Sequence, residues 1–405
     1  MPRSSRRVLL VTLPVQILGG VGSKALFLAR HLARHGHRVS LAYYAARSLR
    51  PDLNASLLGT MVGGQGAIDH FVDDEGFAHH VVGTRFPAFE DTYTAGSENW
   101  NSVFEDYDRF VAVGGSPVIA HPLVRAGRKH FLWCADDLHG DRESRLQAGS
   151  ALRRVADHIA VEGKLIQQQD AVLQGSNAIR GVSGYTVSRL LAHGAVRPEA
   201  VARLPIPVDL DYFAPPPVFK SALRIGFAGR MGDPRKNAPL LFEGLGELRR
   251  QGIPASLHIA GPLDSNTQSL ARQMGLADHI AFLGVLDRSG LRTFFQELDA
   301  FVLPSTREGL AIAGLEAMAC GTPLVSTRSG GPEDYVIDDE TGYLTGSTAA
   351  DLAGALARII GDAKIRERLS LAGRDKVERE FSEAAFSRLL DVVWRDVWQE
   401  RYQEA

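Results

Sequence analysis

The stretch LPSTREGLAIAGLEAMACGTPLVSTRSGGP, residues 303–332, carries the pattern from which the fold of this chain can be inferred. A short apolar strand is predicted at 300–303, ending at Pro304, and an apolar helix follows over 310–319. Gly321, a residue typical of helix ends, closes that helix. A second apolar strand at 323–326 leads into a loop that contains Gly330 and Gly331. The order strand, helix, strand is typical of an α/β fold.

Two glutamates frame the predicted helix. Glu308 lies just before it, and Glu316 follows about two helical turns later. Free N–H groups at a helix start can hold a phosphate or a sugar hydroxyl, and an ionised carboxylate accepts hydrogen bonds from hydroxyl groups. The segment therefore predicts an anion and polyol site that binds a ribose and a hexose on either side of a diphosphate. The alternative is that Glu308 is a solvated loop residue and Glu316 a surface helix residue.

The segment EGLAIAGLE, 308–316, with its flanks LPSTREG and EAMACGTPLVSTRSGGPEDYV, resembles glycosyltransferase family 4. This family contains retaining GT-B enzymes with an E-x7-E motif. The resemblance implies that Glu308 contacts the donor sugar and that Glu316 binds the ribose hydroxyls of the nucleotide. The resemblance also implies that three residues between the two glutamates, at the start of the helix, belong to the donor site: Gly309, Leu310 and Ala311.

Length and composition limit the classes of function. A chain of 405 residues with 45% hydrophobic residues can build two domains with sizeable cores. The net charge of −2 gives no sign of a nucleic-acid partner, and two cysteines make a disulfide framework unexpected. No apolar run reaches membrane-spanning length, and the apolar run 8–12 is too short for a signal peptide. We expect a cytoplasmic protein, with weak peripheral contact to the inner face of a membrane as an open alternative.

The N-terminal part predicts a Rossmann-like domain with a strand at 8–12, a helix at 25–35 and a strand at 38–43. Between the first two lie Gly19, Gly20 and Gly22, which let the backbone approach a ligand at the helix start. A tight turn without a ligand is the alternative. A dinucleotide site is disfavoured because no acidic residue follows the second strand. In family 4 the corresponding glycine loop approaches the donor phosphates.

The acceptor side is harder to predict. Residues 47–106 suggest long loops with weak strands at 80–82 and 71–72. The strand at 109–113 ends in Gly114-Gly115-Ser116, where many family 4 members carry a histidine. The strand at 130–134 leads into a polar loop, and ligands bind outside the carboxyl ends of parallel strands. We therefore take Asp136 and Asp137 as candidates for an acceptor-side acid or base, with His139 behind them. An ordinary solvated loop is the alternative.

The next segments predict a helix at about 151–169 and strands at 171–173 and 178–182. A linker resembling that of family 4 follows at 206–217 and ends in three prolines. We expect an acceptor domain over 1–213, a donor domain over 214–380, and a C-terminal helix over 381–405 that packs back on the first domain. Four apolar residues at fourfold spacing favour a buried face for this helix over a membrane-surface role: Leu390, Trp394, Trp398 and Tyr402.

The second domain opens with a strand at 223–228 and the loop GRMGDPRKN, 229–237. Arg230 and Lys236 flank the start of the next helix, where two cations and free N–H groups favour a diphosphate. Surface cations in a turn are the alternative, but the loop closely resembles the family 4 donor-phosphate loop. Asn237 is a candidate helix cap. Val285 and Leu286 match the segment that contacts the nucleotide base.

Taken with the resemblance, the sequence predicts an α/β protein of the GT-B fold, with two Rossmann-like domains whose parallel sheets face an interdomain cleft. The implied reaction is retaining transfer of a sugar from a nucleotide-diphosphate sugar to a hydroxyl of a glycan, a lipid-linked glycan or a small metabolite. Arg230, Lys236 and helix N–H groups stabilise the leaving diphosphate, so no metal or other cofactor is expected. The alternatives are a non-catalytic nucleotide-sugar-binding protein and a phosphorylase-like enzyme of the same fold.

Overall fold

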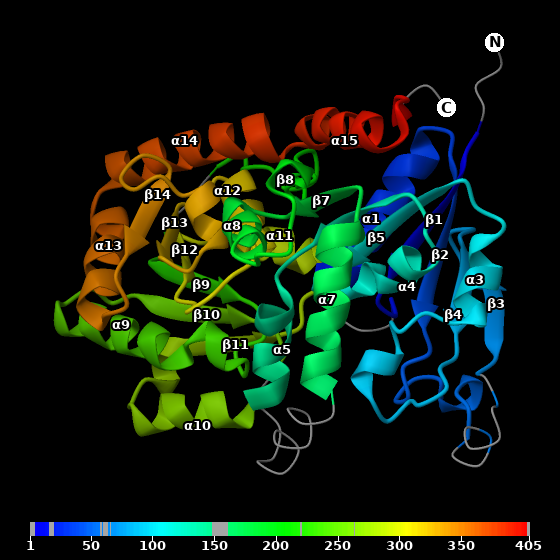
Figure 1. Ribbon diagram of the computed structural model, residues 1–405. Helices are drawn as coiled ribbons and strands as arrows, with labels where there is room; N and C mark the ends of the chain where they lie inside the picture. Colours follow the sequence, from blue (N-terminus) through cyan, green and yellow to red (C-terminus); the bar gives the residue numbers. More distant parts are fainter. Residues whose placement is uncertain are drawn as a thin grey trace. The chain divides into compact units, whose positions relative to one another are not determined.

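The computed structural model describes residues 5–15, 20–56, 59, 64, 66–147, 161–218, 221–262 and 264–402 (Figure 1). The chain divides into two compact units: unit 1 contains Met1–Val182, Thr186–Leu204 and Arg388–Ala405, and unit 2 contains Ser183–Tyr185 and Pro205–Ser387. The chain therefore passes into unit 2 at Pro205 and returns to unit 1 at Arg388. The sequence analysis divided it after residues 213 and 380.

Unit 1 is built on a sheet to which the described residues contribute eight strands, in the order β3-β4-β2-β1-β5-β6-β7-β8. All neighbouring pairs are parallel except β3 and β4, which pair antiparallel at one edge. The strands are β1 (Arg7–Thr12), β2 (Arg38–Tyr44), β3 (Ile68–Val72), β4 (Ala78–Val82), β5 (Arg109–Gly114), β6 (His130–Cys134), β7 (Ala178–Gly181) and β8 (Val201–Arg203).

Helices pack on the faces of this sheet, as expected for strands that are apolar along their whole length. In β1, for example, Val8, Leu9, Leu10 and Val11 are all fully buried. The described helices are α1 (Gly20–Arg34), α3 (Glu98–Phe104), α4 (His121–Arg125), α5 (Leu138–Gln147), α7 (Gly163–Gly175) and α8 (Gly184–Leu191), of which the first two residues of α8 belong to unit 2.

One expectation about unit 1 is confirmed and another is wrong. The described part of residues 47–106 consists mostly of loops and turns, as predicted, and the weak strands expected at 80–82 and 71–72 lie within β4 and β3, but α3 was not predicted. The strand β3 was hard to predict since most of its side chains are exposed, which leaves little hydrophobic signal. The strand expected at 171–173 is instead part of α7, where Val172 and Leu173 are buried on one helix face. Part of the helix expected at 151–169 lies outside the described residues.

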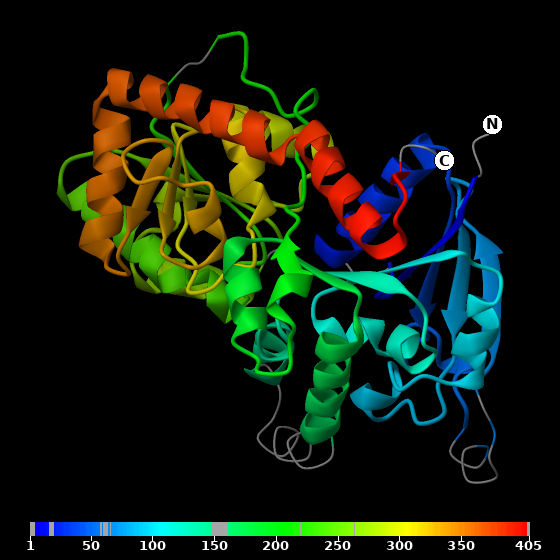
Figure 2. The same ribbon diagram turned by 45° about the horizontal axis from the view of Figure 1, so that its top comes forward.

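Unit 2 contains a second parallel sheet, with six strands from the described residues in the order β11-β10-β9-β12-β13-β14. A cluster of buried residues joins one face of this sheet to α9, α10 and α13. The helix α13 packs against α9, and α14 packs against α12 (Figure 2). The strands are β9 (Arg224–Ala228), β10 (Ser256–Ala260), β11 (Ile280–Gly284), β12 (Ala300–Leu303), β13 (Leu324–Thr327) and β14 (Gly342–Thr345). The helices are α9 (Ala238–Arg250), α10 (Ser265–Gln273), α11 (Arg288–Gln296), α12 (Ile312–Ala319), α13 (Ala349–Gly361) and α14 (Ala363–Phe381), with short 3₁₀ turns η6 (Pro234–Lys236) and η8 (Gly331–Asp334).

The last helix, α15 (Glu383–Trp398), begins in unit 2 and ends in unit 1. Leu390, Trp394 and Tyr402 are fully buried, in agreement with the interpretation of the aromatic stripe as a packed face. In unit 1, His37 Nε2 donates to the backbone oxygen of Tyr402 at 2.8 Å. Across the described residues, no helix combines the length and the apolar character that crossing a membrane requires.

Candidate functional site in unit 2

The predicted donor residues of unit 2 follow the carboxyl ends of neighbouring strands. The loop after β9 carries Arg230 and Lys236, the loop after β12 carries Glu308, and Val285 follows β11. Because all strands of this sheet are parallel, these loops leave the same edge. Ligands of open α/β sheets bind outside this edge. The topology therefore groups the donor residues that the sequence analysis found in three separate segments of this unit.

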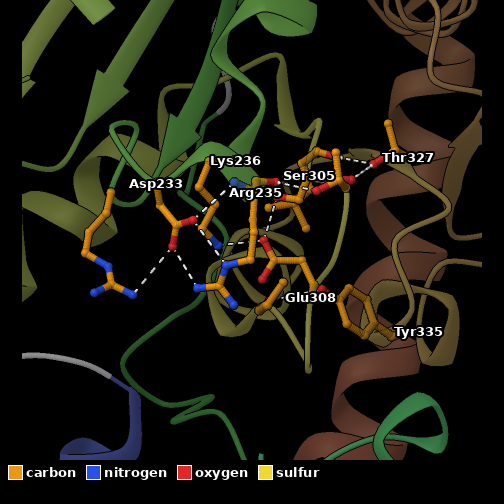
Figure 3. A network of polar contacts seen from close by, with 11 residues as sticks. Asp233, Arg235, Lys236, Ser305, Glu308, Thr327 and Tyr335 are labelled. Atoms are coloured by element: carbon orange, nitrogen blue, oxygen red, sulfur yellow. Dashed lines mark hydrogen bonds and ion pairs between the residues drawn. The ribbon is translucent and has the colours of Figure 1, made fainter. Parts of the chain in front are cut away.

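Glu308 is the centre of the polar network in Figure 3. Its Oε1 accepts a hydrogen bond from Lys236 Nζ at 2.6 Å and another from Ser305 Oγ at 2.6 Å. The residue is 8% exposed, so the carboxylate is held by specific partners instead of being solvated. No described residue donates to Oε2, which leaves that oxygen able to accept a ligand hydroxyl. The alternative of a solvated loop glutamate does not fit this geometry.

The backbone of Glu308 is fixed as firmly as its side chain. Its N–H donates to the oxygen of Ser329, and its oxygen accepts from the N–H of Gly331, which makes a short parallel bridge between the two loops. A Cβ on Gly331 would lie 2.4 Å from the oxygen of Gly309, so only glycine permits this approach. The Gly330-Gly331 pair therefore serves to hold the Glu308 loop at the end of β13.

The loop after β9 is organised by Asp233. Its carboxylate accepts from the backbone N–H of Arg235 and pairs with the Arg235 guanidinium at 2.7 Å (Figure 3). Burial alone would raise the pKa of Asp233, but the hydrogen bond from Arg235 outweighs it and the pKa lies below its usual value. Arg230 lies 3.9 Å from the same carboxylate and is 64% exposed, so its guanidinium remains accessible to an anion.

Two residues in this region differ from the expected helix starts. Asn237 stands at the N-cap position of α9, but its backbone is left-handed, with φ 53°, and its side chain makes no capping hydrogen bond. The helix expected from residue 310 begins at Ile312, because Ala311 is also left-handed, with φ 61°. Leu310 is buried, so it can face a donor only through its backbone.

The strained start of α12 is supported from a distant segment. The hydroxyl of Tyr335, a fully buried residue, donates to the oxygen of Ala311 at 3.0 Å. A Cβ on Gly314 would lie 2.7 Å from that hydroxyl, which explains a glycine in the first turn of the helix. Backbone strain of this kind is often found where a chain is shaped for a ligand. Tyr335 therefore fixes the backbone of the predicted donor site.

Glu316 lies on α12 and is partly exposed. Burial raises the pKa of Glu316 to about 7, against the opposing effect of the Arg288 guanidinium. Arg288 begins α11, three residues after Val285, so this electrostatic effect brings the base segment and the predicted ribose carboxylate into one neighbourhood. Val285 itself is 76% exposed, which leaves it available for contact with a base. The desolvation that raises the pKa of Glu316 distinguishes it from a fully solvated surface glutamate.

In unit 1 the glycine loop is only partly within the described residues. Gly19 lies outside them, Gly20 begins α1, and Gly22 is buried in its first turn. One turn later, Lys24 is 1% exposed, and its Nζ donates to the oxygens of Gly114 and Trp133 at 3.0 and 3.1 Å. Lys24 thus ties the helix that follows the glycine loop to the ends of β5 and β6.

Asp136 and Asp137 are both buried at the end of β6. Asp137 accepts from Arg189 Nη2 at 2.6 Å and from the N–H of Gly140 at 2.7 Å, with His193 Nε2 at 3.4 Å. Burial would raise the pKa of Asp137, but the Arg189 hydrogen bond and the other donors lower it below its usual value. This arrangement suits a structural anchor better than a base, and His139 behind it is exposed.

Several supporting residues carry no signal in the local sequence. Ser305 and Tyr335 reach the site from positions whose residue types are ordinary for a loop, and Arg189 meets Asp137 across a long separation in the chain. The E-x7-E pattern identifies Glu308 and Glu316 but not the residues that hold them. Within the described residues, no group of three or more His, Cys, Asp or Glu side chains has the arrangement of a metal site.

Comparison with known proteins identifies the domain that carries this geometry. Residues 212–376 match the sequence profile described as Glycosyl transferases group 1. The match covers 165 of the 405 residues, and over this part the chain is similar to that family. The match contains Arg230, Lys236, Glu308 and Glu316, and the resemblance inferred from their motifs is confirmed over the group 1 domain.

Curated relatives are similar over about half of the chain. A GDP-mannose-dependent alpha-(1-6)-phosphatidylinositol monomannoside mannosyltransferase from Mycolicibacterium smegmatis is 33% identical over 49% of this chain and 57% of the relative. Its counterpart from Mycobacterium tuberculosis strain H37Rv is 31% identical over 58% and 61%. A D-inositol 3-phosphate glycosyltransferase from Paenarthrobacter aurescens is 30% identical over 49% and 52%. The aligned regions thus span less than two thirds of these relatives.

Solved structures extend the likeness to nearly the whole chain, at the level of the fold. Sucrose-phosphate synthase from Thermosynechococcus elongatus matches with a TM-score of 0.73 and 18% identity, over 98% of this chain and 100% of that one. Anabaena Alr3699/HepE in complex with UDP and glucose matches with a TM-score of 0.69 and 15% identity, over 96% and 99%. The predicted GT-B class, with two Rossmann-like units, is confirmed.

Proposed function

We propose that this protein transfers a hexose from a nucleotide-diphosphate sugar to an acceptor hydroxyl, with retention of anomeric configuration and without a metal ion. The observation that carries the proposal is the Lys236–Glu308 pair, which joins a cationic loop to a carboxylate with one oxygen left for a ligand. Arg230 extends the positive charge of the same loop. Both loops lie in the group 1 domain.

In the proposed reaction the diphosphate binds to Arg230, Lys236 and the N–H groups at the start of α12. Lys236 and the helix N–H groups are held in place before the substrate arrives, so they stabilise the charge on the leaving phosphate without rearrangement. The Glu308 carboxylate accepts a hydrogen bond from a hydroxyl of the donor sugar, and the Glu316 carboxylate accepts hydrogen bonds from the ribose hydroxyls. The new glycosidic bond forms on the face from which the phosphate departs, and a phosphate oxygen takes the proton of the acceptor hydroxyl.

GDP-mannose is the first donor to test, because the mannosyltransferases that resemble this chain are named for it. Two kinds of relative also act on acceptors with a phosphorylated inositol, either as a lipid or as inositol 3-phosphate. We therefore propose an acceptor with a hydroxyl-rich ring and a phosphate. The phosphate of such an acceptor requires a cation, and a lipid tail would bring the enzyme to a membrane surface.

The test is a transfer assay with GDP-mannose, UDP-glucose and ADP-glucose against phosphatidylinositol monomannoside and inositol 3-phosphate, with and without EDTA. We expect one donor to give a product whose new linkage has the anomeric configuration of the donor by NMR. Activity that needs an added metal, or an inverted linkage, would reject the proposed mechanism. Tight nucleotide binding with no transfer and no hydrolysis would favour a non-catalytic binding protein, and use of free phosphate would favour a phosphorylase.

A further inference from the structure

Strands β3 and β4 form one edge of the unit 1 sheet (Figure 1), and they bring two histidines together. The strands are antiparallel, and their register places His70 directly opposite His80. The ring centroids lie 4.9 Å apart in an edge-on arrangement, and the two Nδ1 atoms are 2.6 Å from each other. Because only one proton fits between two nitrogens at this distance, at least one Nδ1 directs a lone pair at the other ring.

The half-buried ring of His80 is fixed from behind by Tyr107. His80 Nε2 and the Tyr107 hydroxyl are hydrogen-bonded at 2.6 Å, and the Ser40 side chain is hydrogen-bonded to the same tyrosine. Tyr107 in turn packs against a cluster of buried residues of unit 1. Since Nε2 of His80 is held on that side, the other ring nitrogen, Nδ1, points to His70.

His70 is exposed, but the residues on either side of it tie its strand to the rest of unit 1. The Asp69 carboxylate accepts a hydrogen bond from Arg50 Nη1 at 2.7 Å. The Phe71 ring stacks on the buried His79 ring, with centroids 4.8 Å apart. These contacts hold the backbone of His70 in place and leave its imidazole as the movable member of the pair.

Two converging imidazole nitrogens suit a transition-metal ion, because imidazole is a preferred ligand of zinc, copper and nickel. With Zn–N bonds of about 2.0–2.1 Å, two nitrogens on a tetrahedral zinc ion lie about 3.3 Å apart. Small rotations of the His70 side chain open the Nδ1–Nδ1 separation from 2.6 Å by the missing amount, about 0.7 Å. No third His, Cys, Asp or Glu joins the pair in the described part of the chain, so water would take the remaining positions.

We propose that His70 and His80 bind one divalent transition-metal ion through their Nδ1 atoms, and that the ion ties the edge strand β3 to β4. Zinc is the first candidate. In the bound form each ring carries its proton on Nε2, and His80 Nε2–H donates a hydrogen bond to the Tyr107 oxygen, so Tyr107 is a positioning residue for the site. Both ligands lie in unit 1, outside the residues that match the group 1 profile, and the inference is independent of the proposed transfer reaction.

The test uses the full chain without a histidine tag, treated with EDTA and desalted. Titration calorimetry with zinc chloride should show one ion per chain, and the melting temperature should rise with zinc concentration, because the ion binds the folded state. His70→Gln and His80→Gln, which keep a polar side chain, should each weaken zinc binding at least tenfold, and the double variant should abolish it. His279→Gln, at a partly exposed histidine of unit 2, is the matched control and should bind zinc as wild type does.

Copper(II) identifies the ligands directly. Electron paramagnetic resonance of the one-to-one copper complex should show coupling to two imidazole nitrogens in wild type, and to one or none after either substitution at His70 or His80. Tyr107→Phe should keep both nitrogens and weaken zinc binding about tenfold, as expected when a metal-bound histidine loses its second hydrogen-bond partner. If Tyr107 serves only the fold, this variant lowers the melting temperature of the metal-free protein and leaves zinc affinity unchanged.

Equal zinc affinity in wild type and in the double variant would overturn the proposal, because the ion would then be bound elsewhere. Absence of zinc binding by wild type would also overturn it, and the short contact would then be a hydrogen bond that serves the fold alone. Zinc should slow hydrogen exchange of the β3 amides at least fivefold in wild type and not in the double variant. Unchanged exchange despite binding through both histidines would reject the tie between the strands. EDTA should leave the proposed glycosyl transfer unchanged, so the failure of one proposal does not decide the other.

Discussion

Lys236 Nζ lies 2.6 Å from Glu308 Oε1, and this ion pair joins the loop after β9 to the loop after β12. Both side chains are mostly shielded from water, at 19% and 9% exposure. A short ion pair of this kind between two loops holds both in one arrangement more effectively than an exposed pair would. Lys236, the proposed phosphate-binding residue, and Glu308, the proposed sugar-binding residue, are therefore positioned relative to each other before a donor binds.

Glu308→Gln should keep the loop but weaken catalysis. The amide is nearly the same size, but it loses the charge that Lys236 and a sugar hydroxyl require. We expect kcat to fall by about 100-fold with a much smaller change in GDP affinity, since the sugar contact acts mainly at the reacting centre. Steady-state transfer kinetics and calorimetric GDP binding measure the two effects. Normal kcat would remove Glu308 from the site.

Arg230→Ala should act on diphosphate binding. Its guanidinium is 64% exposed and lies at 3.9 Å from Asp233, so the fold gains little from it and stability should change by less than about 0.5 kcal/mol. We expect GDP affinity to fall about tenfold while GMP affinity changes less. Arg250→Ala is the control, since Arg250 is a similarly exposed arginine of unit 2 paired to a neighbouring acid. Equal effects in both variants would argue against a diphosphate contact.

Local sequence patterns identified the residues proposed to contact the donor better than the residues that hold them in place. Lys236 and Glu308 stand in short segments with recognisable spacing, and the structure brings them into contact. Tyr335 could not be predicted, because its role depends on a fold that returns it to the start of α12. Asp137 looked like an available base in the loop, but Arg189 on a later helix occupies it. Long-range partners of this kind have no local sequence signal.

The same limit explains the errors in the fold. Central strands such as β1 are continuously apolar, so they were predicted correctly. The edge strand β3 is mostly exposed and was read only weakly, and the apolar run 171–173 was assigned to a strand although it belongs to α7. A short apolar run fits either a strand or one helix face, and tertiary packing decides between them.

Glu316 should make nucleotide binding depend on pH. Its pKa is raised to about 7 by burial, so the carboxyl group is largely protonated below that pH. An ionised carboxylate accepts hydrogen bonds from both ribose hydroxyls, so we expect GDP affinity to rise by up to about tenfold between pH 6 and pH 8. Isothermal titration at both pH values measures this. Glu316→Gln should give lower affinity and no such rise, while the exposed Glu243→Gln should keep it.

Ionisation of Glu316 also affects the stability of the ligand-free protein. Its folded pKa lies above the ordinary value of 4.5, so its favourable contribution is complete below pH 4.5 and is lost as pH rises through about 7. The stability of wild type should therefore fall relative to Glu316→Gln between pH 5 and pH 8. If the melting temperatures of the two proteins change with pH by the same amount over this range, Glu316 is solvated.

Ala311→Gly should stabilise the fold. Ala311 is left-handed, with φ 61°, a conformation that costs an alanine about 1 kcal/mol more than a glycine. Denaturant unfolding should therefore show a gain of up to about 1 kcal/mol. Ala313→Gly, in the first turn of the same helix and with an ordinary helical backbone, should instead lose up to about 1 kcal/mol of stability, because glycine is a poor helix former. Tyr335→Phe removes the hydrogen bond to the backbone oxygen of Ala311 and should lower the free energy of unfolding by about 1 kcal/mol. A loss in Ala311→Gly would contradict the strained helix start.

Lys24 should make the stability of unit 1 depend on pH in the alkaline range. Burial lowers the pKa of Lys24 from 10.5 to about 7, although Cys134 and Asp141 oppose this effect. Since the unfolded lysine binds its proton at higher pH than the folded one, stability is full above about pH 10.5 and is lost as pH falls towards 7. The measurement compares the melting temperatures of wild type and Lys24→Met at pH 7 and at pH 9.5.

The Lys24→Met variant leaves the oxygens of Gly114 and Trp133 without their donor. It should therefore be less stable than wild type by about 1–3 kcal/mol at pH 9.5, and this difference should be smaller at pH 7, where wild type has lost stability. The exposed Lys129→Met should follow wild type at both pH values, and a constant difference between wild type and Lys24→Met would mean that Lys24 stays protonated in the fold.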